Sequence, residues 1–252
     1  MVIVVLPAYN EEDSLPRLLA AFAALPLSSS GQLRIAVVDD GSSDRTVERT
    51  LGYQNRVRLD VVRHGKNRGL GAAMRTGLSW ACGHATEGDV VVAMDADNTH
   101  SPALIPALLE RIEEGHDVVI ASRYAPGGAE VGLSWRRRLM SRAASALLAR
   151  FFPIPGVRDY TCGYRAYRVS ALQRGVGRFG DHLIEEAGFT CMAELLVKLA
   201  AAGCRVAEVP LVLRYDLKAG ASKMRVARTV LRYGRLIMRR RLLTAPARGA
   251  ET

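Results

Sequence analysis

Short apolar runs recur along the first half of this 252-residue chain, and their spacing constrains the fold more than any other feature. Each run is followed by a loop and then, in most cases, by a segment with the apolar periodicity of a helix. Short buried strands that alternate with helices are typical of parallel β-α-β units, so we expect an α/β fold with a mostly parallel central sheet flanked by helices. The predicted strands are residues 2–6, 35–38, 59–62, 90–94 and 118–121.

Polar residues follow three of these predicted strands. Residues 7–11 come after the first strand, Asp39 and Asp40 after the second, and Asp95 and Asp97 after the fourth. The carboxyl ends of parallel strands meet at one edge of a sheet, and ligands of such sheets bind there. We therefore expect these three segments to line a common binding site.

The Asp95-Ala96-Asp97 segment is the best candidate for a metal site. Two carboxylates at alternate positions can converge on a hard cation such as Mg²⁺ or Mn²⁺, with diphosphate oxygens completing its coordination shell. Such a cation would neutralise the charge that develops on a departing nucleoside diphosphate. The same pattern also occurs in ordinary solvated turns, but its place after a fully apolar strand favours the metal interpretation.

Asp39 and Asp40 allow two interpretations. They are compatible with a turn that leads into a helix, and equally with carboxylates that accept hydrogen bonds from a nucleobase or a ribose. Because successive side chains of a strand point to opposite faces, only one of the two needs to face the ligand. The sequence leaves open which one does.

The regular alternation ends after Arg123. Beyond it we expect a basic helix at residues 135–152, a helix at 193–202 and a strand at 206–209. No linker, low-complexity tract or internal repeat divides the chain. We therefore predict one catalytic domain at residues 1–223, with a donor half at about 1–123, an acceptor half at about 124–223, and a basic tail at 224–252.

The net charge of +10 is concentrated near the carboxyl terminus. Nine lysines and arginines and no acid lie between residues 217 and 243, where arginines at helical spacing run beside an apolar stripe. This pattern suits a helix on an anionic membrane surface, and it also suits a helix packed on the domain with its arginines in water. No aromatic stacking platform accompanies the charge, which argues against nucleic acid as the partner.

Compartment and membrane topology follow from the same composition. The four cysteines form no metal-binding or disulfide pattern, and no secretory leader or apolar run of about 18 residues is present. We expect a protein without a transmembrane helix, located in the cytoplasm and peripheral on the cytoplasmic face of the membrane.

Several longer motifs resemble those of family 2 inverting glycosyltransferases, in the same order along the chain. They are residues 7–11 (PAYNE), 38–44 (VDDGSSD), 67–71 (NRGLG), 95–97 (DAD) and 122–124 (SRY). Two further motifs, residues 159–165 (DYTCGYR) and 220–223 (GASK), are similar to the acceptor-side motifs of dolichol- or polyprenyl-phosphate mannose or glucose synthases. The resemblance extends over residues 2–224.

The resemblance implies a nucleotide-binding fold of the GT-A type, and an inverting transfer of a hexose from a GDP- or UDP-sugar to polyprenyl phosphate. It implies metal ligation by Asp95 and Asp97. The residues expected to bind the nucleotide-sugar are Pro7, Ala8, Tyr9, Glu11, Asp39, Asp40, Asp95 and Ala96. The residues expected to be catalytic are Asp97, Asp159, Arg123 and Arg165.

Two positions depart from the pattern of these synthases. Thr99 stands where a metal-binding Gln is frequent in these synthases, so the sequence does not identify a third protein ligand of the metal. Leu217 stands where an Arg commonly precedes the glycine of the last motif, which weakens the assignment of a polyprenyl phosphate acceptor in particular.

The acceptor class decides which residues the chemistry needs. A phosphate monoester is already largely anionic at neutral pH and needs cations to position it, for which we expect Arg123, Arg165, Ser222 and Lys223. A hydroxyl acceptor of a soluble, cell-wall or natural-product molecule needs a general base, and Asp159 or Glu194 is then the candidate. A non-catalytic protein that binds nucleotide-sugars or membranes is the third, more distant hypothesis.

Overall fold

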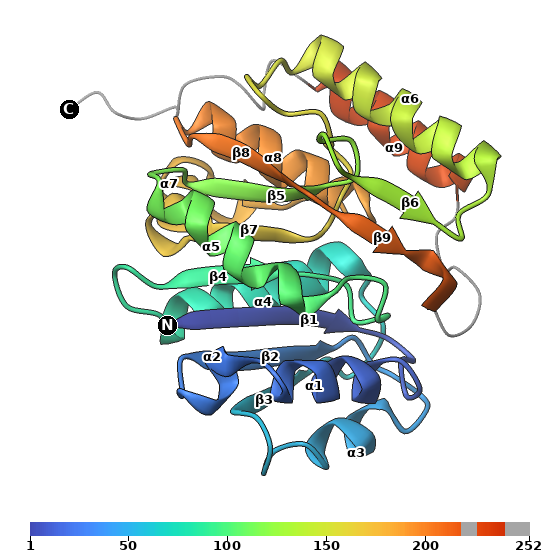
Figure 1. The fold of residues 1–252 in the computed structure, drawn as a ribbon. Coiled ribbons are helices and arrows are strands. Elements are labelled where there is room, and N and C mark those ends of the chain that lie inside the picture. The colour runs from blue at the N-terminus through green and yellow to red at the C-terminus, as the bar shows by residue number, and fades with distance from the viewer. Residues whose placement is uncertain (218–225, 240–252) are drawn as a thin grey trace.

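The computed structural model describes residues 1–217 and 226–239. Its centre is a seven-stranded sheet (Figure 1). In spatial order the strands are β3 (Leu59–Arg63), β2 (Leu33–Asp39), β1 (Val2–Ala8), β4 (Val90–Ala93), β7 (Arg165–Arg168), β5 (Val118–Ser122) and β8 (Val206–Pro210).

Neighbouring strands of this sheet are parallel except where β7 pairs with β4 and with β5. The central strands are buried along almost their whole length, which explains why they are apolar runs rather than alternating patterns. The predicted mostly parallel sheet is therefore confirmed. We did not predict β7, because its sequence of two arginines around Ala166 and Tyr167 has no apolar run.

Helices cover both faces of the sheet. On one face α1 and α5 pack in front of the sheet as drawn in Figure 1, and on the other α4 packs on β1 and β2 with α7 and α8 beside it. The helices are α1 (Leu15–Ala23), α2 (Pro26–Ser29), α3 (Thr46–Leu51), α4 (Leu70–His84), α5 (Ile105–Glu113), α6 (Trp135–Phe151), α7 (Val169–Phe179), α8 (Thr190–Ala201) and α9 (Val226–Met238). Short 3-10 turns lie at Pro102–Leu104, Gly180–Leu183 and Tyr215–Leu217.

A second layer lies beyond the carboxyl ends of the strands. Strands β6 (Ala129–Val131) and β9 (Val212–Arg214) form a two-stranded parallel sheet there, and helices α6 and α9 lie side by side above it (Figure 1). Helix α9 also packs on α8 and buries Tyr233 and Leu236. This layer brings the second half of the chain over the strand ends of the first half.

Candidate active site

A cleft of about 810 Å³ opens at the carboxyl ends of the strands. One side is formed by β1 and the loop after it, by the loop after β4, and by the glycine loop before α4. The other side is formed by Arg123, which directly follows β5, by α6 and α9, and by the segment before α8. The three segments expected to share a site therefore meet in this cleft, and the predicted residues that line it on the first side are Pro7, Ala8, Tyr9, Glu11, Asp40, Asp95, Ala96 and Asp97.

Asp40 and Asp39 differ in their surroundings. Asp40 lines the cleft, and its carboxylate accepts hydrogen bonds from the backbone N–H groups of Arg68 (2.9 Å) and Gly69 (2.8 Å). It also lies 2.7 Å from Nδ1 of the buried His64. Asp39 does not line the cleft; it is buried, and its Oδ1 accepts the Ser42 N–H at 3.1 Å. Asp40 thus holds the glycine loop in place.

The glycine loop is held against a second loop from the other half of the chain. Gly69 has φ of +87°, and a Cβ there would lie 2.7 Å from the carbonyl oxygen of Ala187. A Cβ on Gly71 would lie 1.8 Å from the carbonyl oxygen of Glu186. The backbone N–H of Gly71 donates to the Ala187 carbonyl at 3.2 Å. Only glycine allows this approach, which joins the glycine loop to residues 186–187 from the second half of the chain.

Asp95 and Asp97 follow β4 and both line the cleft. Oδ1 of Asp97 accepts hydrogen bonds from the hydroxyl of Thr99 at 2.6 Å and from its backbone N–H at 3.2 Å. The intervening Asn98 has φ of +62°, a left-handed conformation that Asn tolerates and that closes this tight turn. The Thr99 hydroxyl therefore orients Asp97.

The residues present fit a divalent cation. Among the described residues, no group of three His, Cys, Asp or Glu side chains is placed to hold a metal ion by itself. Mg²⁺ and Mn²⁺ are commonly held by one or two carboxylates together with substrate phosphates, and Asp95 and Asp97 supply such a pair of carboxylates at the cleft. A metal at this position would be held jointly by the chain and by a bound diphosphate.

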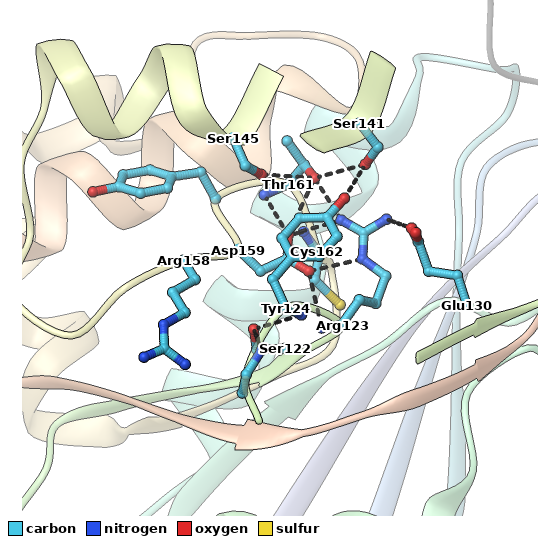
Figure 2. Close-up of polar contacts among 12 residues, drawn as sticks. Ser122, Arg123, Tyr124, Glu130, Ser141, Ser145, Arg158, Asp159, Thr161 and Cys162 are labelled. Atoms are coloured by element: carbon cyan, nitrogen blue, oxygen red, sulfur yellow. Dashed lines mark hydrogen bonds and ion pairs between the residues drawn. The ribbon is translucent and has the colours of Figure 1, made fainter. Parts of the chain in front are cut away.

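On the opposite side of the cleft, Arg123 forms an ion pair with Asp159 (Figure 2). The Nε and Nη2 atoms of Arg123 donate to the two carboxylate oxygens of Asp159, both at 2.7 Å, and Nη2 also donates to the Thr161 hydroxyl at 2.6 Å. Nη1 lies 3.3 Å from the Glu130 carboxylate. Arg123 lines the cleft, whereas Asp159 is fully buried behind it.

Burial and charge act in opposite directions on this pair. Burial alone would favour neutral forms, but the Arg123 guanidinium and its hydrogen bonds outweigh burial and hold the pKa of the Asp159 carboxyl below its ordinary value. The Asp159 carboxylate likewise outweighs burial and raises the pKa of Arg123. Burial raises the pKa of the adjacent Tyr124 phenol to about 12. The pair is therefore ionised at neutral pH.

The two carboxylates proposed as general bases are both engaged in the protein. Asp159 accepts from Arg123 and from the backbone N–H groups of Thr161 and Cys162. Glu194 is buried, accepts the backbone N–H of Glu185 and Glu186 at 2.8 Å each, and pairs with Lys198 at 2.7 Å. Neither lines the cleft, so this geometry does not fit a base that acts on an acceptor hydroxyl.

Arg165 requires a correction, because it does not line the cleft. Its side chain is 0% exposed, and it donates to the carbonyl oxygens of Met192 (2.5 Å) and Tyr160 (2.9 Å). Arg165 begins strand β7, so its position ties the sheet to α8, and the acceptor contact that we expected of it does not fit this burial. The other two expected acceptor contacts, Ser222 and Lys223, lie outside the described residues.

Two arginines that we did not select line the same side of the cleft as Arg123. Arg137 of α6 donates to the Tyr215 hydroxyl at 2.8 Å, and Arg232 comes from α9. A Cβ on Gly188 would lie 2.3 Å from Nη1 of Arg232, so this arginine sits directly over the loop before α8. The sequence showed both arginines within basic segments, but it contained no indication of which members of each run face inward.

Comparison with known proteins identifies the family. The pattern described as Glycosyl transferase family 2 matches residues 3–176, which span the donor side of the cleft and the Arg123–Asp159 pair. The chain belongs to glycosyl transferase family 2. This family 2 enzyme is therefore a glycosyltransferase, as the motifs predicted.

Curated relatives of this glycosyltransferase include two lipid-phosphate mannosyltransferases. It is 34% identical over 225 residues to polyprenol monophosphomannose synthase of Mycolicibacterium smegmatis, covering 88% of this chain and 80% of that protein. It is 35% identical over 228 residues to undecaprenyl-phosphate mannosyltransferase of Micrococcus luteus, covering 88% of this chain and 87% of that one.

A solved structure confirms the fold. The glucosyl-3-phosphoglycerate synthase of Mycobacterium tuberculosis, crystallised with Mn²⁺, uridine diphosphate and glucosyl-3-phosphoglycerate, matches with a TM-score of 0.65 and 25% sequence identity. The match covers 96% of this chain and 78% of that one. Within residues 1–217 and 226–239, the helices are too short or too polar to cross a membrane.

Proposed function

We propose that this glycosyltransferase transfers a hexose, with inversion, from a GDP- or UDP-sugar to the phosphate of a polyprenyl phosphate. A phosphate oxygen of the lipid attacks the anomeric carbon, the bond from that carbon to the diphosphate breaks, and the nucleoside diphosphate leaves. Mannose is the first sugar to test, because the two relatives above are named for mannose and for lipid phosphates.

One observation carries the proposal. The acceptor side of the cleft presents the cations Arg137 and Arg232 beside Arg123, whose own charge is paired with Asp159 and Glu130. The two carboxylates considered as bases are buried and paired. A phosphate monoester has a second pKa of about 6, so it needs positioning by cations and no general base. The charge of the cleft therefore matches a phosphate nucleophile better than a hydroxyl.

The donor side supports the same reaction. Asp95 and Asp97 are the proposed ligands of Mg²⁺ or Mn²⁺, which would neutralise charge on the departing diphosphate. Residues 7–11, Asp40 and the glycine loop line the space proposed for the nucleotide. The cation of the similar Mn²⁺ structure is consistent with this assignment.

The basic carboxyl-terminal segment at 224–243 is the proposed contact with the anionic cytoplasmic face of the membrane. In the part that the structure describes, α9 turns Leu231, Arg235 and Met238 outward, whereas Tyr233 and Leu236 pack inward. The outward residues recur at helical spacing, as expected of a helix at a lipid interface.

The competing function is transfer of the sugar to a hydroxyl acceptor, and Glu186 would then be the general base. Glu186 is buried next to Ala187, which lines the cleft. Burial and the neighbouring Glu194 raise the pKa of its carboxyl. Arg232, Arg235 and Arg239 lower this pKa, but burial and Glu194 outweigh them.

The deciding experiment compares a short-chain polyprenyl phosphate with the matching polyprenol, which has the same chain and a free hydroxyl. GDP- and UDP-hexoses are screened with Mn²⁺ or Mg²⁺, and transfer into the organic phase is counted. We expect metal-dependent transfer to the phosphate alone, a β-linked product by NMR, and little effect of Glu186→Gln. Transfer to the alcohol, abolished by Glu186→Gln, would establish the competing function instead.

A further inference from the structure

Helix α6 is oriented against the usual rule for a surface helix, which buries its apolar face. Its buried residues are Ser145 and Leu148, and Ser141 turns inward to accept a hydrogen bond from the Tyr124 hydroxyl at 2.8 Å (Figure 2). Three of its large apolar residues point outward instead: Trp135 is 66% exposed, Leu139 61% and Leu147 46%. A helix whose polar side faces the protein has its apolar side available for a partner.

The charges on the same helix are all of one sign. Arginines alternate with the exposed apolar residues, and between residues 131 and 158 there is no acid. The exposed arginines of α6 are Arg136, Arg138, Arg142 and Arg150. The Arg136 guanidinium lies 5.5 Å from the centre of the Trp135 ring. This mixture of Trp, Leu and Arg complements a surface that is both anionic and apolar.

The exposed face of α6 belongs to the same helix as one wall of the cleft. Arg137, Ser141 and Ala144 line the cleft from α6, one or two positions away from the exposed residues. Helix α9, with its outward Leu231 and Met238, lies beside α6 (Figure 1). A surface bound to the outside of α6 would therefore lie next to the acceptor side of the cleft.

We propose that the exposed face of α6 docks on an anionic lipid bilayer. We define this face by Trp135, Leu139 and Leu147 with Arg136, Arg138, Arg142 and Arg150. The apolar side chains enter the boundary between headgroups and acyl chains, and the arginines bind lipid phosphates. This inference rests on the proposed function, since the bilayer is where a polyprenyl phosphate resides. It assigns membrane contact to a helix in the middle of the chain as well as to the basic tail.

Trp135 supplies a direct measurement on the unaltered protein. The tryptophan fluorescence of the chain, to which Trp80 also contributes, is recorded with vesicles of phosphatidylcholine alone and with vesicles that contain phosphatidylglycerol, at low and at high salt. We expect a blue shift only with the anionic vesicles, weakened by salt, and lost in Trp135→Phe, which keeps an apolar ring. An unchanged spectrum at saturating vesicle binding would show that another surface makes the contact, and the proposal would be wrong.

A pair of variants tests the apolar contact. Leu139→Glu with Leu147→Glu places two acids on the face, and Val176→Glu places one acid on α7, where Val176 is 51% exposed. We expect co-sedimentation with anionic vesicles to weaken roughly tenfold or more in the α6 variant and to stay unchanged in the α7 variant. Equal binding by both variants and the parent chain would overturn the proposal.

Two further measurements distinguish membrane docking by α6 from the proposed transfer reaction and from dimer formation. Transfer to a water-soluble short-chain polyprenyl phosphate should persist in the α6 variant, because neither substituted residue lines the cleft. If the parent chain transfers to no polyprenyl phosphate, the proposed function is wrong, while vesicle binding still tests α6. If sedimentation shows a dimer that the α6 variant abolishes, with vesicle binding intact, the face belongs to a second copy and the membrane proposal is wrong.

Discussion

Arg123 and Asp159 form a two-pronged ion pair in which both N–O distances are 2.7 Å. The pair joins the end of β5 to the segment before β7, and Arg123 lines the cleft. A carboxylate that we expected to be catalytic is thus the partner that holds an arginine in position. This relationship gives the first two predictions.

Asp159→Asn should destabilise the fold strongly, since it leaves the largely buried Arg123 with the longer Glu130 contact as its remaining ion pair. Removing one member of a buried pair typically costs about 3–5 kcal/mol in the free energy of unfolding. Urea unfolding measures this value, with the exposed Asp181→Asn as the control. A loss below about 1 kcal/mol would mean that the pair is not a major support of the cleft.

The same pair should make stability depend on acid pH. The pKa of Asp159 is lower in the folded protein than its ordinary value of 3.8. Its contribution is therefore complete above that value and is lost as the pH falls through the lower, folded pKa. The difference in unfolding free energy between the parent chain and Asp159→Asn should shrink below about pH 4. A difference that stays constant from pH 6 to pH 2 would contradict this assignment.

Gly71 and Gly83 of α4 form a matched pair of glycines. A Cβ at Gly71 meets the Glu186 carbonyl at 1.8 Å, whereas nothing lies within 4 Å of a Cβ at Gly83. Gly71→Ala should force the glycine loop away from the loop before α8 and weaken both stability and donor binding. Gly83→Ala should leave binding unchanged and raise stability by about 0.5–1 kcal/mol, as alanine does in a helix. Thermal melts and donor titrations compare the two.

His64 should act on donor binding through Asp40. It bridges the Asp40 carboxylate at 2.7 Å and the Thr76 hydroxyl at 3.0 Å. His64→Leu removes one partner of that carboxylate, so we expect KM for the donor to rise by about tenfold with a smaller change in kcat. His64→Asn, which keeps a donor group, should recover part of the effect, and the exposed His84→Leu should have none. A pure fall in kcat would point to a different role.

Substitutions at Asp97 and Thr99 should distinguish the proposed metal ligand, Asp97, from the residue that orients it, Thr99. Asp97→Asn should reduce transfer by at least about 100-fold and leave the fold intact, since the metal loses a charged ligand. Thr99→Val removes the hydroxyl that orients Asp97, and groups in such positions typically change metal affinity by about 10–100-fold. Calorimetric titration of Mn²⁺ in the presence of GDP or UDP measures both. Unaltered Mn²⁺ affinity in Asp97→Asn would exclude this residue as a ligand.

The donor half could be predicted because its determinants are local in the sequence. An apolar run such as 90–94, followed at once by Asp95 and Asp97, specifies both a buried strand and the polar end of that strand. In a parallel sheet the carboxyl ends of the strands lie at one edge, so the polar residues that follow them are expected close together. Asp40 could not be separated from Asp39 in this way, because the choice depends on which face the glycine loop packs against.

The acceptor half was predicted less well because its arginines have no local pattern. Arg165 and Arg137 both lie in polar segments of the sequence, yet one is fully buried against backbone carbonyls and the other lines the cleft. The difference comes from partners that are distant along the chain, namely Met192 for Arg165 and Tyr215 for Arg137. Charge alone does not reveal whether a guanidinium will meet a carbonyl, a hydroxyl or a ligand.

The family and the mostly parallel sheet could be inferred from the amino-acid sequence, since motifs, apolar runs and the residues at strand ends are encoded over a few neighbouring positions. That Asp159 supports Arg123, that Arg165 is internal, and that α6 turns Trp135, Leu139 and Leu147 outward became evident only from the folded chain. These facts depend on how α6, α8 and α9 pack over the sheet. Burial and ion pairing are properties of that packing, and no short stretch of sequence contains them.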